Sequence, residues 1–380
     1  MYRQTGVKLK MINLKSKKVL CISHATLPNI GGVEVYVYDL CEYLSKNDIE
    51  VLLLTSDISS NPGIEIVNEK FKILRIESFT PVKNYPIPKF WRRDLYKNLS
   101  LIYRFKPNYF ITNTRFFFSS AFPLLYLKKR PFWIHIEHGS EFVNAENIVV
   151  KIISRIFDET LGKLILYKSN KIICVSNAVQ KFLTHLTKKQ TSVVYRGFHS
   201  EQYQLVRKKR EIITFGYLGR FSKQKNIENA ISAFIKINQI YKNTRFVIAG
   251  GRFDLQRIKV LSAYNIENIG IIKKEEVPHY LNQIDVFISP SISGGGLGTS
   301  LVEALLSNCI IISTPNEGAV DLEKYIKNRG IIVKNGSIEE IYTGIKYVID
   351  NFKQINKTEY ADPQKTFTFQ KWVDGIFAKI

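Results

Sequence analysis

Cysteine is scarce in this chain of 380 residues. The four cysteines, Cys21, Cys41, Cys174 and Cys309, lie far apart, and no two of them have the Cys-x-x-Cys spacing. A disulfide framework or a cysteine-based zinc site is therefore not expected. The thiols are predicted to be buried in a protein of the reducing cytosol.

Long apolar segments are also missing. The longest nearly apolar run, residues 116–127, is shorter than the ~20 residues that a membrane-spanning helix needs. The basic segment 1–18 is followed by too few apolar residues for the core of a secretory signal. These absences predict a cytoplasmic protein, whose contact with a membrane would have to be peripheral.

Negative charge is in short supply. The net charge is +22, and residues 1–195 hold 29 basic against 15 acidic residues, compared with 26 against 18 in the remainder. A basic first half favours an anionic partner such as phospholipid, nucleic acid or a pyrophosphate-linked substrate, although a solvated lysine-rich surface explains it equally well. The aromatic and basic residues form no recognisable RNA or DNA module, so no nucleic-acid partner is expected.

The chain does contain two series of short apolar runs that alternate with helical patterns. Such runs predict parallel sheets covered on both faces, and two series predict two Rossmann-like, doubly wound α/β domains that meet near residues 197–210. Ligands are then expected beyond the carboxyl ends of the strands, in a cleft between the domains. Strands are predicted at 17–23, 49–56, 108–113, 132–138, 170–176, 212–219, 245–251, 284–291 and 309–315, and helices at 33–47, 226–241 and 300–308.

Three loops at these strand ends have the composition of anion-binding sites. Gly31 and Gly32 precede a predicted helix, whose backbone N–H groups suit a phosphate, although a plain tight turn explains them equally well. Arg220 and Lys225 occupy a strand-to-helix crossover, where they could neutralise a diphosphate or simply be exposed cations.

The third loop is the start of "SGGGLGTSLVEALLSNC", residues 293–309. Its glycines would let backbone amides approach a ligand without obstruction by side chains. Glu303 follows within apolar neighbours, and its carboxylate could accept two hydrogen bonds from a ribose diol. The glycines are Gly294, Gly295, Gly296 and Gly298.

In this order the motifs resemble the retaining glycosyltransferase family 4, also described as glycosyl transferases group 1, which has the GT-B fold. The resemblance covers nearly the whole chain and is most specific in two blocks, "YLGRFSKQKNIENAISAF" and "GGLGTSLVEAL". It implies an N-terminal acceptor-side domain at 1–200, a nucleotide-sugar donor domain at 201–365, and a tail at 366–380 that packs back on the first domain.

The resemblance also implies roles for individual residues. Arg220 and Lys225 would bind the donor diphosphate, and Glu303 would hold the ribose. The segment "HIEHGSEF" places His138 at the active-site histidine of the family, although a core histidine at a strand end is the plainer alternative. Gly31 and Gly32 would approach the diphosphate or sugar from the first domain.

One acid of the family pattern is missing. A glutamate is expected eight positions before Glu303, where this chain has Gly295. Either the enzyme is active and holds the sugar with the amides of residues 295–298 and with Glu317, or the chain is a non-catalytic copy that binds a nucleotide-sugar. Activity is favoured because the cations and Glu303 remain.

The expected reaction is transfer of a sugar, of the hexosyltransferase type, from a UDP- or GDP-linked donor to a hydroxyl of a glycan or lipid-linked glycan acceptor. It would serve cell-envelope polysaccharide or lipopolysaccharide synthesis, with no cofactor and no metal. A nucleotide-sugar epimerase on the same fold is a rival reading, but the "GRFSKQKN" and "LVEAL" blocks count against it.

Segment 89–106 is expected to form a helix that either packs on the sheet through its apolar face or binds an anionic membrane through its charge. Its apolar residues are Trp91, Leu95, Leu99, Ile102 and Phe105, and its basic residues are Lys89, Arg92, Arg93, Lys97, Arg104 and Lys106.

Overall fold

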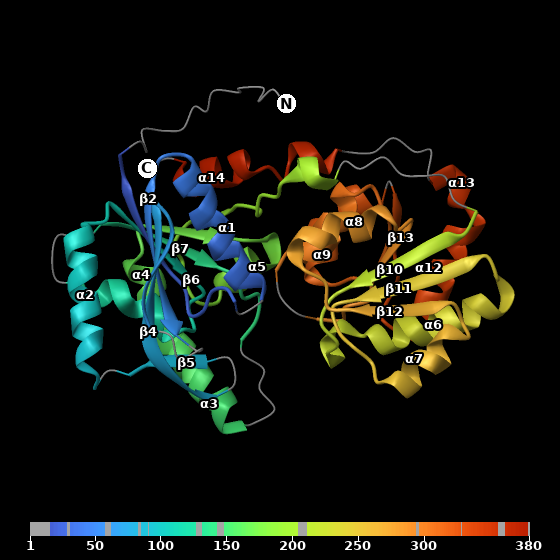
Figure 1. The fold of residues 1–380 in the computed structure, drawn as a ribbon, viewed down its shortest axis with the longest axis horizontal. Helices are drawn as coiled ribbons and strands as arrows, with labels where there is room; N and C mark the ends of the chain where they lie inside the picture. The colour runs from blue at the N-terminus through green and yellow to red at the C-terminus, as the bar shows by residue number, and fades with distance from the viewer. Residues whose placement is uncertain are drawn as a thin grey trace. The chain divides into compact units, whose positions relative to one another are not determined.

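The computed structural model describes residues 16–28, 31–57, 62–82, 85–89, 91–126, 131–142, 148–203, 211–293, 296–327, 329–355 and 362–378. The chain divides into two compact units (Figure 1). Unit 1 comprises Met1–Gly197 and Phe369–Ile380, and unit 2 comprises Phe198–Thr368.

Unit 1 is built around one sheet with the strand order β3-β4-β2-β1-β6-β7-β8-β9 and with β5 paired to β4. The pairings are parallel except for β3 and β5, which run antiparallel to β4. The strands are β1 (Lys18–Ile22), β2 (Glu50–Asp57), β3 (Gly63–Asn68), β4 (Phe71–Val82), β5 (Tyr85–Pro88), β6 (Tyr109–Asn113), β7 (Phe132–Glu137), β8 (Lys171–Cys174) and β9 (Thr191–Val193).

Helices cover both faces of this sheet because successive strand residues point to opposite sides. Val19 and Cys21 join a core with α1 and α14, whereas Leu20 and Ile22 join a core with α2. The helices of unit 1 are α1 (Gly32–Lys46), α2 (Arg93–Phe105), α3 (Ile148–Phe157), α4 (Lys163–Lys168), α5 (Asn177–Leu183) and α14 (Phe369–Phe377), with a 3₁₀ segment at Phe118–Leu125 and a π turn at Asp158–Gly162.

The C-terminal helix α14 belongs to unit 1, although unit 2 precedes it in the sequence. The indole Nε1 of Trp372 donates a hydrogen bond of 2.8 Å to the hydroxyl of Tyr36 in α1. Phe369 stacks on Tyr43 with ring centroids 4.9 Å apart. These contacts attach residues 369–378 to the first helix of the chain.

Unit 2 has a six-stranded, entirely parallel sheet with the order β12-β11-β10-β13-β14-β15. Helix α6 packs on it through Ala230, Phe234 and Ile237, which are spaced three or four residues apart and fully buried. The strands are β10 (Ile213–Leu218), β11 (Thr244–Ala249), β12 (Ile266–Gly270), β13 (Val286–Ser289), β14 (Ile310–Ser313) and β15 (Gly330–Ile332), and the helices are α6 (Ile227–Ile240), α7 (Leu255–Ser262), α8 (Val277–Asn282), α9 (Thr299–Leu306), α10 (Glu317–Asp321), α11 (Glu323–Ile326), α12 (Ile338–Asp350) and α13 (Phe352–Ile355).

The two doubly wound α/β units confirm the predicted fold class, and each predicted strand and helix of the two alternating series is present within about two residues of its expected bounds. Strands β3, β4, β5, β9, β12 and β15 were not predicted. Strand β4 extends the sheet by parallel pairing with β2, whereas β3 and β5 pair antiparallel with β4, which the Val/Ile/Leu-run pattern does not indicate. All four cysteines are free thiols and buried, as the sequence predicts.

The helix predicted at 89–106 is shorter than expected, because α2 begins at Arg93. Trp91 precedes the helix, is 68% exposed and contacts Phe79, so it does not belong to the apolar face. Leu95 and Ile102 are buried in the core beneath the sheet, which accounts for the apolar face of α2 as a packing surface.

No helix within the described ranges is long and apolar enough to cross a membrane. Residues 116–127, the longest nearly apolar run, largely form the 3₁₀ segment Phe118–Leu125.

Candidate functional site

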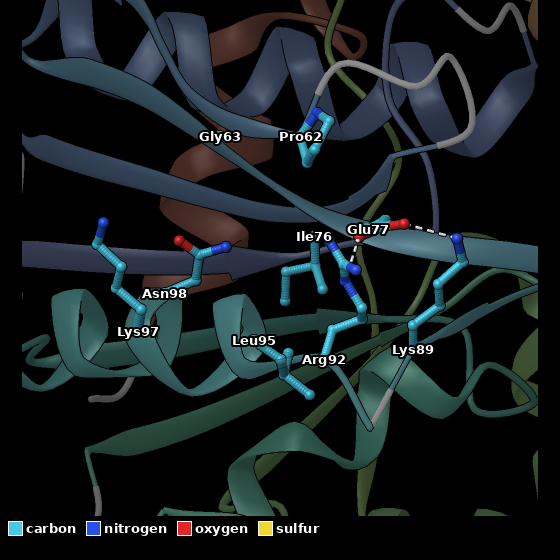
Figure 2. Close-up of a pocket in the computed structure, with 9 residues that line it drawn as sticks. All are labelled: Pro62, Gly63, Ile76, Glu77, Lys89, Arg92, Leu95, Lys97 and Asn98. Carbon is cyan, nitrogen blue, oxygen red and sulfur yellow. Dashed lines mark hydrogen bonds and ion pairs between the residues drawn. The ribbon is translucent and has the colours of Figure 1, made fainter.

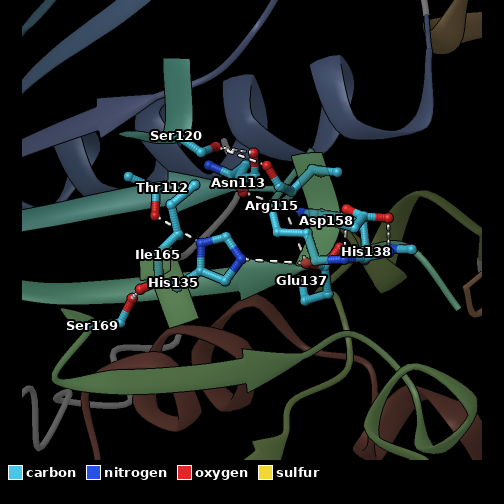
Figure 3. Close-up of polar contacts among 12 residues, drawn as sticks. Thr112, Asn113, Arg115, Ser120, His135, Glu137, His138, Asp158, Ile165 and Ser169 are labelled. Atoms are coloured by element: carbon cyan, nitrogen blue, oxygen red, sulfur yellow. Dashed lines mark hydrogen bonds and ion pairs between the residues drawn. The ribbon is translucent and has the colours of Figure 1, made fainter. Parts of the chain in front are cut away.

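In unit 1 the candidate residues gather where the neighbouring strands β1, β6 and β7 end. Asn113 is the last residue of β6, and Glu137 and His138 follow one another at the end of β7 (Figure 3). Parallel strands bring their carboxyl ends to one edge of a sheet, so residues distant in sequence become neighbours.

His138 is held in one orientation and kept neutral. Its Nε2 lies 3.1 Å from Oδ1 of Asn113, and its ring meets Tyr36 edge-on at 4.6 Å between centroids. Burial lowers the pKa of His138 to about 3, assisted by the nearby His135 and opposed by Glu137. At neutral pH His138 is therefore an uncharged hydrogen-bonding group rather than a cation.

The turn that carries His138 rests on the buried carboxylate of Glu137. One carboxylate oxygen accepts hydrogen bonds from the backbone N–H groups of His138 at 3.0 Å and Gly139 at 2.9 Å. Nη1 of Arg115 lies 3.2 Å from the same oxygen, and His135 lies 3.3 Å from the other (Figure 3). The side chains of Arg115, His135 and Glu137 are all fully inaccessible to solvent.

Arg115 joins two buried carboxylates, because Asp158 of the π turn also lies 3.2 Å away. Burial alone would raise the pKa of Glu137, but Arg115, His135 and the N–H of Gly139 outweigh it and hold that pKa far below its usual range. Burial raises the pKa of Asp158 by more than Arg115 lowers it, so the pKa of Asp158 stays above its usual value. Glu137 is thus the main counter-ion of Arg115.

The two glycines at the start of α1 differ in what lies next to them. A Cβ atom on Gly31 would stand 2.2 Å from Oε2 of Glu34, so a side chain there would displace that carboxylate. A Cβ atom on Gly32 would meet no heavy atom within 4 Å. A ligand can therefore approach the start of α1 at Gly32.

In unit 2 the candidate residues follow the ends of β10, β13 and β14, which are neighbours in the sheet. Lys225 lies in a 3₁₀ turn, and Gln224 of that turn accepts a 3.0 Å hydrogen bond from the backbone of Ile292 in the loop after β13. Burial lowers the pKa of Lys225, and so does the charge of Arg220, whereas Glu317 raises it. Arg220 and Glu317 are thus both close enough to Lys225 to affect its pKa.

The glycine-rich loop before α9 is packed against the start of α10. Gly296 and Gly298 have φ angles of 84° and 70°, a region that side chains other than glycine rarely occupy. A Cβ atom on Gly318 would stand 2.8 Å from the carbonyl oxygen of Leu297, so the close approach of α10 also requires glycine. Gly294 and Gly295 lie outside the described residues.

Glu303 is nearly buried, with 8% of its surface exposed. Its Oε1 accepts a 2.9 Å hydrogen bond from the hydroxyl of Tyr203, which precedes β10 in the short 3₁₀ segment Ser200–Tyr203. The carboxylate is therefore oriented by a residue one hundred positions earlier in the chain.

Sequence reasoning did not identify Tyr203, Arg115, Glu137 or Asp158. Glu137 stood next to His138 in the quoted "HIEHG" motif, and its acidic character within an apolar strand was a usable signal. Nothing in the sequence indicated that Arg115 would be the buried partner of both Glu137 and Asp158, or that Tyr203 would hydrogen-bond Glu303.

One cavity in the described part of unit 1 lies away from these residues. It measures about 270 Å³ and lies between β4 and α2 (Figure 2). Glu77 in its wall is bound by Nζ of Lys89 at 2.6 Å and by Nε of Arg92 at 3.0 Å. None of the site residues predicted from the sequence lines this cavity. Within the described ranges, no cluster of three or more His, Cys, Asp or Glu side chains could hold a metal ion.

Two family models match consecutive parts of the chain. The model for glycosyltransferase family 4 matches residues 30–202, and the model for glycosyl transferases group 1 matches residues 200–364. An uncharacterised glycosyltransferase of Methanocaldococcus jannaschii, MJ1069, is 29% identical over 358 residues, covering 89% of this chain and 91% of the relative.

More distant proteins have the same organisation. The capsular polysaccharide biosynthesis glycosyltransferase CapM of Staphylococcus aureus is 23% identical and covers 82% of this chain and 83% of its own length. The crystal structure of Anabaena HepE in complex with UDP and glucose has a TM-score of 0.65 at 14% identity, with 93% and 96% of the chains covered. Fold and family models together lead to one conclusion: the chain belongs to the group 1, family 4 glycosyltransferases, which have the GT-B fold.

Proposed function

We propose that this glycosyltransferase moves a hexose from a nucleoside-diphosphate sugar to a hydroxyl of a glycan or lipid-linked glycan, with retention at the anomeric carbon. The observation that carries the proposal is the grouping of Arg220, Lys225 and Glu317 beside the glycine loop, at the carboxyl ends of β10, β13 and β14. Two cations beside an open backbone loop suit a diphosphate, and HepE was solved with UDP.

In the proposed reaction the bond between the anomeric carbon and the diphosphate breaks, and negative charge develops on the leaving diphosphate. Arg220 and Lys225 stabilise that charge from fixed positions, which is where electrostatic catalysis acts. The acceptor hydroxyl attacks the same face of the sugar, and a diphosphate oxygen takes its proton. Glu303, oriented by Tyr203, accepts hydrogen bonds from the ribose.

Unit 1 supplies the acceptor side of this proposal. The neutral His138 hydrogen-bonds the transferred sugar, and the Glu137–Arg115 pair fixes the turn from which it projects. Gly32 leaves room for the ligand at the start of α1. We place the reaction at the cytoplasmic face of the membrane, in cell-envelope polysaccharide synthesis, in line with the role of CapM in capsular polysaccharide biosynthesis.

A panel of UDP- and GDP-linked sugars tests this function directly. The purified chain is incubated with each donor in the absence of an acceptor, and release of the nucleoside diphosphate is measured. Slow hydrolysis of at least one donor supports a transferase. Nucleotide binding without release from any donor would instead support the second candidate, a non-catalytic nucleotide-sugar-binding protein, which Gly295 in place of the family's acid favours.

Glu303→Gln is expected to weaken binding of the free nucleoside diphosphate, because an amide accepts fewer and weaker hydrogen bonds from a ribose diol than a carboxylate does. Loss of a charged hydrogen bond corresponds to roughly a tenfold rise in Kd. Calorimetry with UDP and GDP measures this. Tyr203→Phe removes only the orienting hydroxyl and should show a smaller effect in the same direction. Unchanged affinity for both nucleotides in Glu303→Gln would assign this glutamate a structural role.

The exposed cations of α2 are expected to hold the protein on an anionic membrane by charge. Arg93, Lys97 and Arg104 are exposed on a helix whose apolar face is already used in packing. Each cation near an anionic leaflet contributes about 1 kcal/mol. The protein should sediment with anionic vesicles at low salt, ignore neutral vesicles and dissociate as salt rises. Charge reversal at Arg93 and Lys97 should weaken this binding, and binding to anionic vesicles that does not depend on salt would contradict it.

A further inference from the structure

Helix α3 has an apolar face that no described residue of unit 1 covers. Ile148, Ile152, Ile153 and Ile156 are between 52% and 64% exposed, and no residue of this ten-residue helix is buried. Residues at these spacings share one side of a helix. Soluble proteins rarely expose so contiguous an aliphatic surface unless it contacts a partner.

An aromatic groove runs beside this helix. Ile153 and Phe157 of α3 form one wall, and Tyr85 of β5, Phe116 and Phe117 contribute to the others. The groove has a volume of about 150 Å³ and lies where α3 and β5 are neighbours (Figure 1). Phe118, which also lines the groove, packs edge-on against Phe157 at 5.0 Å. The lining is aromatic and aliphatic, so it suits a hydrocarbon chain.

Among the described residues, two buried polar atoms without a hydrogen-bond partner belong to His24, which contacts the groove residue Phe117, and to Thr114, three residues before Phe117 in the chain. Phe117 stacks on the ring of His24 with centroids 3.6 Å apart. Nε2 of His24 lies 3.3 Å from Glu34, whereas its Nδ1 is buried and has no hydrogen-bond partner among the described residues. Oγ1 of Thr114, whose φ of 63° is unusual for a β-branched residue, is also buried without a partner in the described chain. Buried polar atoms of this kind call for a ligand or an ordered water.

We propose that α3 and this groove bind the hydrocarbon part of a membrane lipid, with the polar head of that lipid against His24 and Thr114. The proposal rests on the transferase function above and specifies its acceptor as a lipid. The exposed isoleucines lie among the hydrocarbon chains of the bilayer, and one chain enters the groove. This places a lipid hydroxyl beside the carboxyl end of β1, next to the start of α1.

The charges around α3 favour an anionic lipid surface over a second copy of this chain. Residues 148–168 contain four cations and two acids, and one of those acids, Asp158, is buried against Arg115. Two copies meeting through this face would bring like charges together in a protein of net charge +22. Lys163 is already paired with Glu159, so an anionic bilayer instead pairs with Lys151 while it takes up the isoleucines.

A tryptophan reporter tests insertion. In a Trp91→Phe background, Ile153→Trp places an indole on the exposed face of α3, and Val260→Trp, at a site in α7 with a closely similar exposure, is the control. With vesicles of phosphatidylcholine and phosphatidylglycerol, the emission at 153 should shift to shorter wavelength and be quenched by lipids brominated on their acyl chains, whereas the emission at 260 should not change. Vesicle binding without any shift at 153 overturns the proposal.

Charged substitutions test the same face in the otherwise unchanged protein. Ile152→Glu with Ile156→Glu should weaken vesicle binding at least ~10-fold, because carboxylates do not enter hydrocarbon, while hydrolysis of a nucleotide-sugar in solution stays unchanged. Because both sites are exposed, folding is not at risk, and a melting curve verifies this. Undiminished binding overturns the proposal, as would a dimer in light scattering that these substitutions dissociate.

Alkyl glucosides test the groove and its polar end. Below its micelle concentration, octyl glucoside should bind the protein at least ~10-fold more tightly than methyl glucoside, because only the former reaches the groove. His24→Phe preserves the stacking on Phe117 but lacks both nitrogens, and should weaken binding of both glucosides. Equal affinity for the two glucosides, or no effect of His24→Phe, contradicts the proposal. If the protein hydrolyses a nucleotide-sugar but fails these tests, the lipid-binding proposal is wrong and the proposed transferase function stands. If it passes these tests but hydrolyses no nucleotide-sugar, only the proposed transferase function is wrong.

Discussion

Replacing either Lys225 or Arg220 by alanine is expected to lower the rate of sugar transfer by about a hundredfold or more while the protein stays folded. Both side chains lie at the carboxyl edge of the unit 2 sheet, where the charge of Arg220 helps to lower the pKa of Lys225 after the larger effect of burial. Removal of one preorganised donor to a developing negative charge costs about 3–4 kcal/mol of transition-state stabilisation. The loss should appear in kcat, because that charge is fully developed only as the diphosphate departs.

Lys223→Ala provides the matched control for this experiment. Lys223 belongs to the same 3₁₀ turn and is exposed, so its removal changes the net charge equally without touching the proposed diphosphate site. Its rate should stay within about twofold of the unmodified protein, as is usual for exposed substitutions. Near-normal turnover in both Lys225→Ala and Arg220→Ala, measured with the best donor of the panel, would show that the diphosphate binds elsewhere.

Glu137→Gln is expected to reduce the free energy of unfolding by about 3–5 kcal/mol, because it leaves the guanidinium of Arg115 buried without its main counter-ion. The substitution keeps the volume of the side chain, so a lost cavity contact cannot explain the effect. It also weakens the acceptor of the His138 and Gly139 amides, and transfer should fall with it. Denaturant unfolding followed by circular dichroism measures the change.

Asp158→Asn is the matched comparison. Asp158 also contacts Arg115, but its pKa is raised, whereas that of Glu137 is lowered. The charged form is therefore less stabilised at Asp158 than at Glu137. Replacement of Asp158 should therefore cost less stability than that of Glu137. A loss in Glu137→Gln of less than ~1 kcal/mol, or a larger loss in Asp158→Asn, would show that the turn carrying His138 does not depend on this ion pair.

The same network sets a dependence on pH. The pKa of Glu137 is lower in the folded than in the unfolded chain, so its contribution is present above the unfolded value of about 4.3 and is lost as pH falls below it. His138 acts in the same direction, because its folded pKa of about 3 lies below the unfolded value of about 6.5, and unfolding takes up a proton between them. Stability should therefore decline as the solution is acidified, and Glu137→Gln should reduce the part of the decline below about pH 4.3.

The alternation of apolar runs was sufficient to predict the strands that form the centre of each sheet. This information is local, because a buried parallel strand needs only a few consecutive Val, Ile or Leu residues, and a helix needs apolar residues three or four positions apart. Helices α1, α6 and α9 and strands β1, β10 and β13 follow from such neighbours. The three loops with candidate donor residues follow as well, since they lie directly after predicted strands.

Only the tertiary structure decided which distant residues meet. Strand order brings Arg115 to Glu137 and Asp158, and the packing of a short segment before β10 brings Tyr203 to Glu303. It also decided that the isoleucines of α3 remain exposed, whereas Leu95 and Ile102 of α2 are covered. The physical reason is that contacts between residues far apart in the chain depend on strand pairing and on the packing of whole elements, whereas the periodicity that a sequence displays extends over only a few residues at a time.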